Sequence, residues 1–187
     1  MNRMHRWLCK SDGWRRSLSE QIVPWVLHDI DLGSDVLEVG PGPGLTTDLL
    51  RPRFERLTAI EIDERLADAL QQRLADTNVA VVRGDATRMP FEEASFSGSV
   101  AFTMLHHVPS VEKQDQLLRE VCRVLKPGAV FAGTDAIRSL RLRLLHIADT
   151  YVPIDPVKFN SRLAAAGFTD VRITDDGQRF RFQARRA

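Results

Sequence analysis

The stretch from Val36 to Gly44, VLEVGPGPG, sets the strongest limits on how this chain can fold. Its apolar residues are typical of a short, buried parallel strand. Glycines follow at positions 40, 42 and 44, and without a Cβ atom they let the backbone turn tightly or approach a ligand closely. A helix is predicted over residues 45–50, so its first N–H groups would point towards whatever the loop holds. Strand, glycine loop and helix together indicate a nucleotide-binding unit.

A carboxylate lies at a suitable distance from this loop. A second strand is predicted over residues 57–62, and Glu61 lies at its carboxyl end, twenty-one residues after Gly40. In a strand–helix–strand unit, a carboxylate there can accept hydrogen bonds from both hydroxyls of a ribose. The glycine spacing is GxGxG, not the GxGxxG of dinucleotide sites, so the loop favours an adenosine without phosphates.

A third strand, predicted over residues 79–82, leads to a second acidic candidate, Asp85. A carboxylate just beyond a parallel strand faces the same sheet edge as the glycine loop and Glu61. We therefore expect Asp85 to accept a hydrogen bond from an adenine amine, and the Ala86 N–H to donate to a neighbouring ring nitrogen. The alternative is a turn in which Asp85 binds its own backbone.

Several segments resemble the class I methyltransferases that use S-adenosylmethionine. Residues 38–44 look like the family's first motif, and Glu61 matches its acidic ribose ligand. The LHHV sequence within residues 103–109 is similar to that of small-molecule and lipid methyltransferases, where this segment passes beneath the methyl donor. LKPG at residues 125–128 resembles the family's turn before an apolar strand. One departure is Ser97, where family members often carry Asp before the fourth strand; it concerns the local turn and not donor binding.

Five alternating strand and helix patterns followed by two closing strands predict a doubly wound α/β sheet of seven strands, and the resemblance implies that it is Rossmann-like. Most strands are expected to be parallel, with one antiparallel edge strand near residues 179–185 and helices on both faces. We expect a single domain over residues 1–187, divided into a helical leader (1–33), a donor-binding core (34–135), an insert (136–158) and a C-terminal helix with a strand pair (159–187). Pro24 predicts a break in the leader helix near Val23.

The resemblance also implies S-adenosylmethionine as cofactor, with S-adenosylhomocysteine as product. The residues expected to bind the donor are Glu38, Gly40, Pro41, Gly42, Gly44, Glu61, Ile62, Asp85, Ala86, Phe102 and Thr103. Among them, Glu38 is expected to support the glycine loop or the donor's ammonium.

Two adjacent histidines are the catalytic candidates. His106 or His107 would act as a general base or as a hydrogen-bond donor that places the nucleophile. Because adjacent residues leaving a strand point in different directions, we expect only one of them to face the cleft. The alternative is that a histidine here simply packs on the donor.

Motifs that are absent from the sequence narrow the range of possible methyl acceptors. The chain lacks the Asn/Asp-Pro-Pro-Tyr/Phe sequence of methyltransferases that act on DNA base amines, and the Pro-Cys pair used for attack on cytosine carbon. Residues 102–104 carry no acid that could join Asp135 in a magnesium site, so we expect metal independence. A net charge of +1 gives little support for a nucleic-acid partner.

We expect instead a small, largely apolar molecule or lipid as acceptor. Trp7 and Trp14 of the leader and the leucine-rich segment from Arg138 to Thr150 would enclose it. Arginines of that segment would suit a carboxylate or phosphate on the acceptor. The alternative is that these leucines complete the core and the arginines are solvated.

Composition sets the remaining expectations. With 43% hydrophobic and 27% charged residues, no secretory signal and no apolar run long enough for a membrane span, the sequence predicts a cytoplasmic protein, for which peripheral membrane contact stays open. Cys9 and Cys122 are expected to form neither a disulfide nor a zinc site.

Two rival functions are a nicotinamide-dependent oxidoreductase, which leaves Asp85 and LHHV unexplained, and a non-catalytic protein that binds S-adenosylmethionine or S-adenosylhomocysteine.

Overall fold

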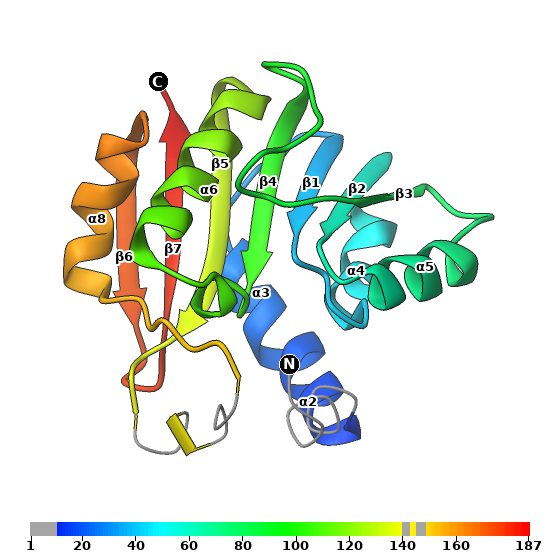
Figure 1. Cartoon of the computed structure of the whole chain (residues 1–187), viewed down its shortest axis with the longest axis horizontal. Helices are drawn as coiled ribbons and strands as arrows, with labels where there is room; N and C mark the ends of the chain where they lie inside the picture. The colour runs from blue at the N-terminus through cyan, green and yellow to red at the C-terminus, as the bar shows by residue number, and fades with distance from the viewer. Residues whose placement is uncertain (1–10, 140–142, 145–148) are drawn as a thin grey trace.

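A seven-stranded sheet is the framework of the computed structural model of the chain, which describes residues 11–139, 143–144 and 149–187 (Figure 1). The strands are β1 Asp35–Val39, β2 Arg56–Glu61, β3 Val79–Arg83, β4 Phe96–Phe102, β5 Leu125–Ala136, β6 Phe168–Asp175 and β7 Arg179–Arg186. Their order is β3-β2-β1-β4-β5-β7-β6. β1 to β5 are parallel, and β7 is antiparallel to β5 and β6. The predicted doubly wound, mostly parallel sheet is confirmed.

The antiparallel strand is β7, which covers the residues where one was predicted. It lies one position in from the edge, because β6 pairs with its far side. Phe180 and Phe182 of β7 are buried in an apolar cluster with Phe131 of β5.

The strand order places a switch point between β1 and β4. The chain winds from β1 through β2 to β3 and then returns to add β4 and β5 on the other side of β1. In open α/β sheets, ligands bind outside the carboxyl ends of the strands at such a point. The glycine loop, Glu61 and Asp85 follow β1, β2 and β3, so they lie along this edge.

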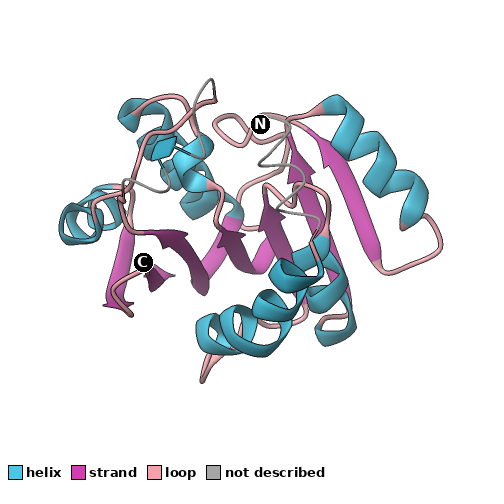
Figure 2. Cartoon of the chain, turned by 90° about the horizontal axis from the view of Figure 1, so that it is seen from below, coloured by secondary structure: helices cyan, strands magenta, loops and turns pink. Residues whose placement is uncertain are grey.

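Helical segments cover both faces of the sheet (Figure 2). They are α2 Asp12–Ser17, π-helical η1 Leu18–Ile22, α3 Val23–Leu27, α4 Leu45–Leu50, 3₁₀-helical η2 Arg51–Arg53, α5 Glu64–Arg73, 3₁₀-helical η3 Leu105–His107, α6 Val111–Val124 and α8 Pro156–Ala165. One buried cluster joins α6 and α8 to the sheet, and another joins η1, α3 and α4 to it. Neighbouring residues of β1 divide between them, since Leu37 belongs to the first cluster and Val36 to the second, as strand alternation requires.

The leader changes helix type where a break was predicted. The π-helical η1 ends at Ile22 and an α-helix starts at Val23, with Pro24 in its first turn. The backbone stays helical across this change, because the Val23 N–H donates to the Leu18 carbonyl oxygen. Ile22 and Val26 are buried in the cluster that includes β1 Val36, so η1 and α3 are packed on the sheet.

Ser97 lies inside β4 and not in a turn before it, because β4 begins at Phe96. The Ser97 Oγ accepts the Asp35 N–H at 2.9 Å and lies 2.9 Å from the Leu32 carbonyl oxygen. The serine therefore ties the start of β1 to β4. From the sequence, Ser97 was expected to affect only the turn before the fourth strand.

The LKPG segment is also part of a strand. β5 begins at Leu125, which pairs with Phe96 before a shift in register leads to the next pair, Gly98 with Val130. Gly128 has φ of 78°, a conformation that glycine adopts without strain, so the predicted turn is a bulge within β5.

Two further sequence predictions concern the cysteines and a membrane-spanning helix. Cys122 of α6 is buried in the apolar cluster beneath that helix, as predicted, whereas Cys9 lies outside the described residues. Within the described part of the chain, no helix is long and apolar enough to cross a membrane.

Candidate functional site

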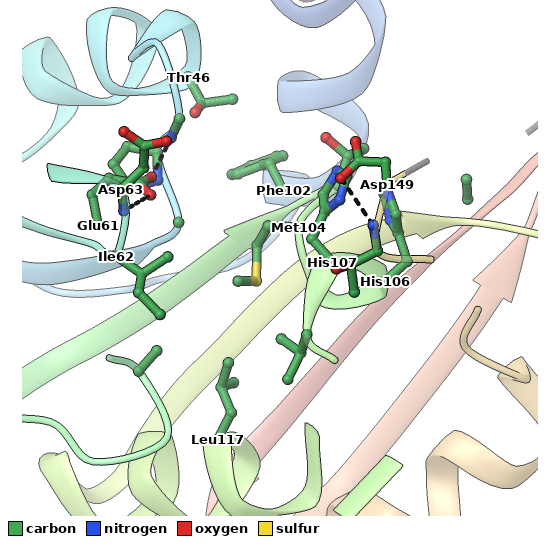
Figure 3. Close-up of a pocket in the computed structure, with 18 of the residues that line it drawn as sticks. Thr46, Glu61, Ile62, Asp63, Phe102, Met104, His106, His107, Leu117 and Asp149 are labelled. Atoms are coloured by element: carbon green, nitrogen blue, oxygen red, sulfur yellow. Dashed lines mark hydrogen bonds between the residues drawn. The ribbon is translucent and has the colours of Figure 1, made fainter. Parts of the chain in front are cut away.

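A cavity of about 890 Å³ opens along the carboxyl edge of the sheet. Its walls come from the loops after β1 to β5, from the leader, and from the turn between β6 and β7. Glu61 and Ile62 lie on one side in Figure 3 and His106 and His107 on the other, with Met104 between them. The volume is near the upper end of the roughly 300–1,000 Å³ of small-molecule sites.

The glycine loop supplies one wall through Gly40, Pro41 and Gly42. The Gly42 N–H donates to Glu61 Oε2 at 2.9 Å, and no protein atom lies within 4 Å of the place where a Cβ would stand. That open position fits a loop that a ligand approaches closely. Gly44 does not line the cavity: it precedes α4 with φ of 83°, and a Cβ there would lie 2.3 Å from Leu70 Cδ1. Helix packing therefore explains this glycine.

Glu61 is held at the centre of this wall. Its carboxylate accepts the Gly42 N–H through Oε2 and the Asp63 N–H through Oε1, both at 2.9 Å, and the residue is only 6% exposed. Each carboxylate oxygen has further lone-pair positions, so a group fixed in this way can still accept hydroxyls from the cavity. The structure thus places Glu61 where a ribose ligand was predicted; the role itself stays a prediction.

Glu38 lies behind the loop and does not line the cavity. Its carboxylate is buried and accepts hydrogen bonds from the hydroxyls of Thr46 and Thr47, the latter at 2.7 Å. Burial raises the pKa of Glu38 from 4.5 to about 7; the two hydroxyls oppose the rise, and the charges of Asp48 and Glu61 add to it. Glu38 therefore fastens β1 to the first turn of α4, consistent with a supporting position.

Asp85 and Ala86 line the cavity beyond β3. The Asp85 Oδ1 accepts the Thr87 N–H at 2.8 Å, so this aspartate does form the turn that the sequence offered as its alternative role. This turn holds Asp85 at the cavity wall, and its role as an adenine ligand stays a prediction.

Phe102, the last residue of β4, and Thr103 after it line the cavity; their donor-binding role stays a prediction. Thr103 has φ of 51°, which is uncommon for a β-branched residue, and its N–H donates to the Thr134 carbonyl oxygen at 2.8 Å. Such strained positions cluster at functional sites. Met104 also lines the cavity and packs over Gly40, where a Cβ would lie 2.9 Å from the Met104 Cε. No pattern in the sequence singles out Met104.

Both histidines line the cavity, so the prediction that only one would face it was wrong. The reason is that the chain leaves β4 in a 3₁₀ turn, Leu105–His107, and not as an extended strand. Successive side chains of a 3₁₀ turn are about 120° apart, which lets two neighbours border one space. The ring centroids of His106 and His107 lie 4.2 Å apart.

His106 is also paired with Asp135, at the carboxyl end of β5. The His106 Nδ1 lies 2.5 Å from Asp135 Oδ1, and the side chains are 5% and 0% exposed. Burial lowers the pKa of His106, but the charge and hydrogen bond of Asp135, with the charge of Asp149, more than offset this and leave the pKa raised. From the sequence, Asp135 was weighed only as a ligand of a magnesium site. Among the described residues, no three His, Cys, Asp or Glu side chains are grouped to hold a metal; metal independence stays a prediction.

The far wall comes from segments outside the donor-binding core. Trp14 and Leu18 belong to the leader, and Arg138 belongs to the predicted insert. Trp7 and most leucines of that insert lie outside the described residues. Gln178 and Arg179 were missed: Gln178 precedes β7 and Arg179 begins it, and the antiparallel pairing of β7 with β5 brings this start to the edge where β5 ends.

Comparisons with known proteins agree with this geometry. A family model described as "Methyltransferase domain" matches residues 37–133, just over half of the chain. A sterol 24-C-methyltransferase of Gibberella zeae is 29% identical over 178 residues, which is 82% of this chain and 46% of that protein. A probable ribosomal RNA small subunit methyltransferase A of Pyrobaculum aerophilum is 33% identical over 155 residues, 75% of this chain and 66% of that protein. The chain thus spans about half to two thirds of these two relatives.

Two solved structures share the fold. A methyltransferase from Aquifex aeolicus, described as dependent on S-adenosylmethionine, has a TM-score of 0.78 and 21% identity, with all of both chains covered. A phosphoethanolamine N-methyltransferase of Haemonchus contortus, in complex with S-adenosyl-L-methionine, has a TM-score of 0.77 and 14% identity, covering 100% of this chain and 60% of that one.

Proposed function

The chain belongs to the class I S-adenosylmethionine-dependent methyltransferases, and we propose that it transfers a methyl group from this donor to a small, largely apolar molecule or lipid. The observation that carries the proposal is the continuity of one cavity. It runs from the glycine loop and Glu61, which fit an adenosine, to the histidines and Trp14, which lie outside the adenosine wall.

The donor half is assigned from the residues that line it. Glu61 would bind the ribose hydroxyls, Asp85 and the Ala86 N–H would bind the adenine, and Gly40–Gly42 would pass along the donor's amino-acid part. Ile62, Phe102 and Thr103 would flank the donor, and Glu38 would support the loop from behind. The structure fits such a ligand, because the loop is open at Gly42 and a fixed carboxylate faces the same space.

The chemistry asks little of the protein beyond alignment. Bound S-adenosylmethionine would supply a methyl group on a positively charged sulfur, which is a good leaving group. The chain must then hold the acceptor in line and keep the cleft dry, and positioning of this kind contributes on the order of 7–11 kcal/mol. Apolar walls formed by Leu18, Met104 and Leu117 favour exclusion of water.

The acceptor half supports a small ligand with an apolar body. Trp14, Val108 and Ile137 supply apolar surface, while Arg138 and Arg179 supply positive charge. We propose that the leader (1–33) and the insert (136–158) enclose the acceptor above the donor-binding core (34–135). The names of relatives point both ways, since one methylates sterols and another is named for ribosomal RNA.

Two measurements test the proposal. Calorimetry should show binding of S-adenosylmethionine and S-adenosylhomocysteine but not of NAD; binding of NAD alone would support an oxidoreductase. Methyl-labelled donor is then mixed with the protein and separate metabolite, lipid and RNA fractions of a cell extract. Label should enter the metabolite or lipid fraction. Label confined to RNA would refute the acceptor class, and donor binding without transfer to any fraction would favour the non-catalytic alternative.

A further inference from the structure

Arg179 brings a guanidinium to the cavity wall that donates no hydrogen bond to any described residue. It is the first residue of β7, it lines the cavity, and its side chain is 24% exposed. Its ion-pair partner is Asp176, whose Oδ2 lies 3.9 Å from the Arg179 Nε, too far for a hydrogen bond. The guanidinium N–H groups are therefore open to a ligand in the cavity.

Two other arginines with small exposed fractions are fully engaged by the protein. Arg162 and Arg186 each have a side chain that is 15% exposed. Arg162 donates to Asp115 and Arg186 to Glu93, both at 2.6 Å, and each donates to further oxygens of the chain. A guanidinium stays charged and carries five N–H donors, so leaving them unused in a partly closed wall costs free energy unless water or a ligand accepts them. Arg179 is thus the exception that needs an acceptor from outside the chain.

The turn that presents Arg179 is fixed by its backbone and not by the guanidinium. The Asp176 Oδ1 accepts the N–H groups of Gln178 and Arg179, both at 2.8 Å. The Ile137 N–H donates to the Gln178 carbonyl oxygen at 2.9 Å, which ties the turn to the end of β5. Structure alone therefore does not require an arginine at the start of β7.

The charged residues that line the cavity are divided by sign. After β2 and β3 the described lining residues are acidic: Glu61, Asp63 and Asp85. Beyond β4 they are mostly basic, with Asp149 set against Lys113, Arg138 and Arg179. An anionic group on a ligand is therefore repelled by the first wall and attracted by the second.

We propose that the methyl acceptor carries an anionic oxyacid group, a carboxylate or a phosphate, that Arg179 binds in a two-point contact. This inference rests on the proposed methyl transfer. A planar guanidinium matches the paired oxygens of either group. Strand alternation puts Arg179 on the same sheet face as Arg181, which lies over Trp25 of α3, so the apolar body of the acceptor meets Trp14 and Leu18 of the leader. The anion is an anchor and is not itself methylated; it keeps that end of the acceptor away from the acidic wall, so the other end faces the donor.

The first test measures binding and needs no methyl transfer. The full chain, saturated with S-adenosylhomocysteine, is titrated by calorimetry with octanoate, octyl phosphate and 1-octanol, which share an apolar chain. At least one anion should bind about tenfold or more tightly than octanol, and the tighter anion identifies the group. Arg179→Gln should weaken that anion roughly ten- to hundredfold, the usual loss for hydrogen bonds to a charged group, and leave octanol nearly unchanged. Failure of both anions to bind at millimolar concentration, or an anion preference that survives Arg179→Gln, would overturn the anion site.

Two further variants separate a specific contact from net charge. Arg172 is exposed on β6 and does not line the cavity, so Arg172→Gln removes the same charge and should keep the anion preference, because exposed charges contribute little. Arg179→Lys keeps the charge but loses the two-point contact, and its anion affinity should lie between those of the unchanged protein and Arg179→Gln. Equal losses in Arg172→Gln and Arg179→Gln would overturn the site. An unchanged affinity for S-adenosylhomocysteine in each variant shows that the donor wall is intact.

The second test identifies the products of transfer. Labelled donor is mixed with the protein and the metabolite and lipid fractions, and mass spectrometry determines whether the labelled products carry a carboxylate or phosphate. They should carry one, and Arg179→Gln should lower transfer at limiting extract but recover when more extract is added, as expected for lost acceptor binding. Labelled products with neither group would overturn this inference and leave methyl transfer standing. No transfer by the unchanged protein would instead defeat the proposed function.

Discussion

Replacing Glu61 by Gln should weaken donor binding without unfolding the protein. The carboxylate accepts two N–H groups at 2.9 Å, from Gly42 and Asp63, in a cavity wall that is almost closed to water. A glutamine can still offer one oxygen, but its amide nitrogen would face the other N–H, and the negative charge that favours ribose hydroxyls is gone. A hydrogen bond to a charged group contributes about 1.5–3 kcal/mol, which corresponds to a roughly ten- to hundredfold rise in Kd.

Calorimetry with S-adenosylhomocysteine measures this change, and Glu64→Gln provides the control. Glu64 lies three residues away and pairs with Arg83, but its side chain is 59% exposed and does not line the cavity. Its replacement removes the same charge and should leave Kd within about twofold, because exposed ion pairs contribute little. A folded Glu61→Gln protein with the Kd of the unchanged protein would refute the assignment.

A ligand analogue separates direct contact from support of the glycine loop. S-Adenosylhomocysteine without its ribose 2′-hydroxyl should bind the unchanged protein less tightly. In the Glu61→Gln protein, loss of the same hydroxyl should weaken binding little further. If Glu61 and the hydroxyl contact each other, their separate losses of binding free energy do not add. Equal losses in both proteins would mean that Glu61 acts only through Gly42 and Asp63.

Two further predictions concern stability. Burial raises the pKa of Glu38 from 4.5 to about 7. Between pH 4.5 and pH 7 the folded protein therefore holds a proton on Glu38 that the unfolded chain has lost. The free energy of unfolding should fall by about 3 kcal/mol as pH rises through this window. Urea unfolding at pH 5 and 8 should show this loss, and Glu38→Gln should remove it. Gly44→Ala should lower unfolding free energy by about 1–3 kcal/mol, since its Cβ would meet Leu70 at a φ of 83°. Gly13→Ala, with no atom near its Cβ, should be neutral or stabilising in the same urea assay; equal effects would contradict the packing argument.

The cavity wall formed by the glycine loop, Glu61 and Asp85 was predictable because its signals are local in the sequence. Glycines placed directly after an apolar run mark the end of a parallel strand, and parallel strands bring their carboxyl ends to one edge. Glu61 and Asp85 follow from that rule alone, and the structure places both at the cavity wall. Even the alternative role of Asp85, a turn, could be stated from the residue type.

The acceptor half was less predictable because its residues meet only through long-range pairing. His106 and Asp135 are far apart in sequence and meet because β4 and β5 are neighbours in the sheet. Arg179 reaches the cavity only because β7 inserts between β5 and β6. The 3₁₀ turn that lets both histidines border the cavity likewise depends on tertiary contacts, including the hydrogen bond from Val152 to His106.

The most direct test of methyl transfer through this cavity is the stoichiometry of the reaction. The protein is incubated with ¹³C-methyl donor and a protein-free and RNA-free lipid and metabolite extract, and mass spectrometry quantifies S-adenosylhomocysteine and labelled products together. One labelled methyl group should appear in an extracted molecule for each S-adenosylhomocysteine formed, and Glu61→Gln should lower both in parallel at limiting donor. S-Adenosylhomocysteine formed only when RNA is added, or labelled product that is unaffected by Glu61→Gln under those conditions, would contradict this account.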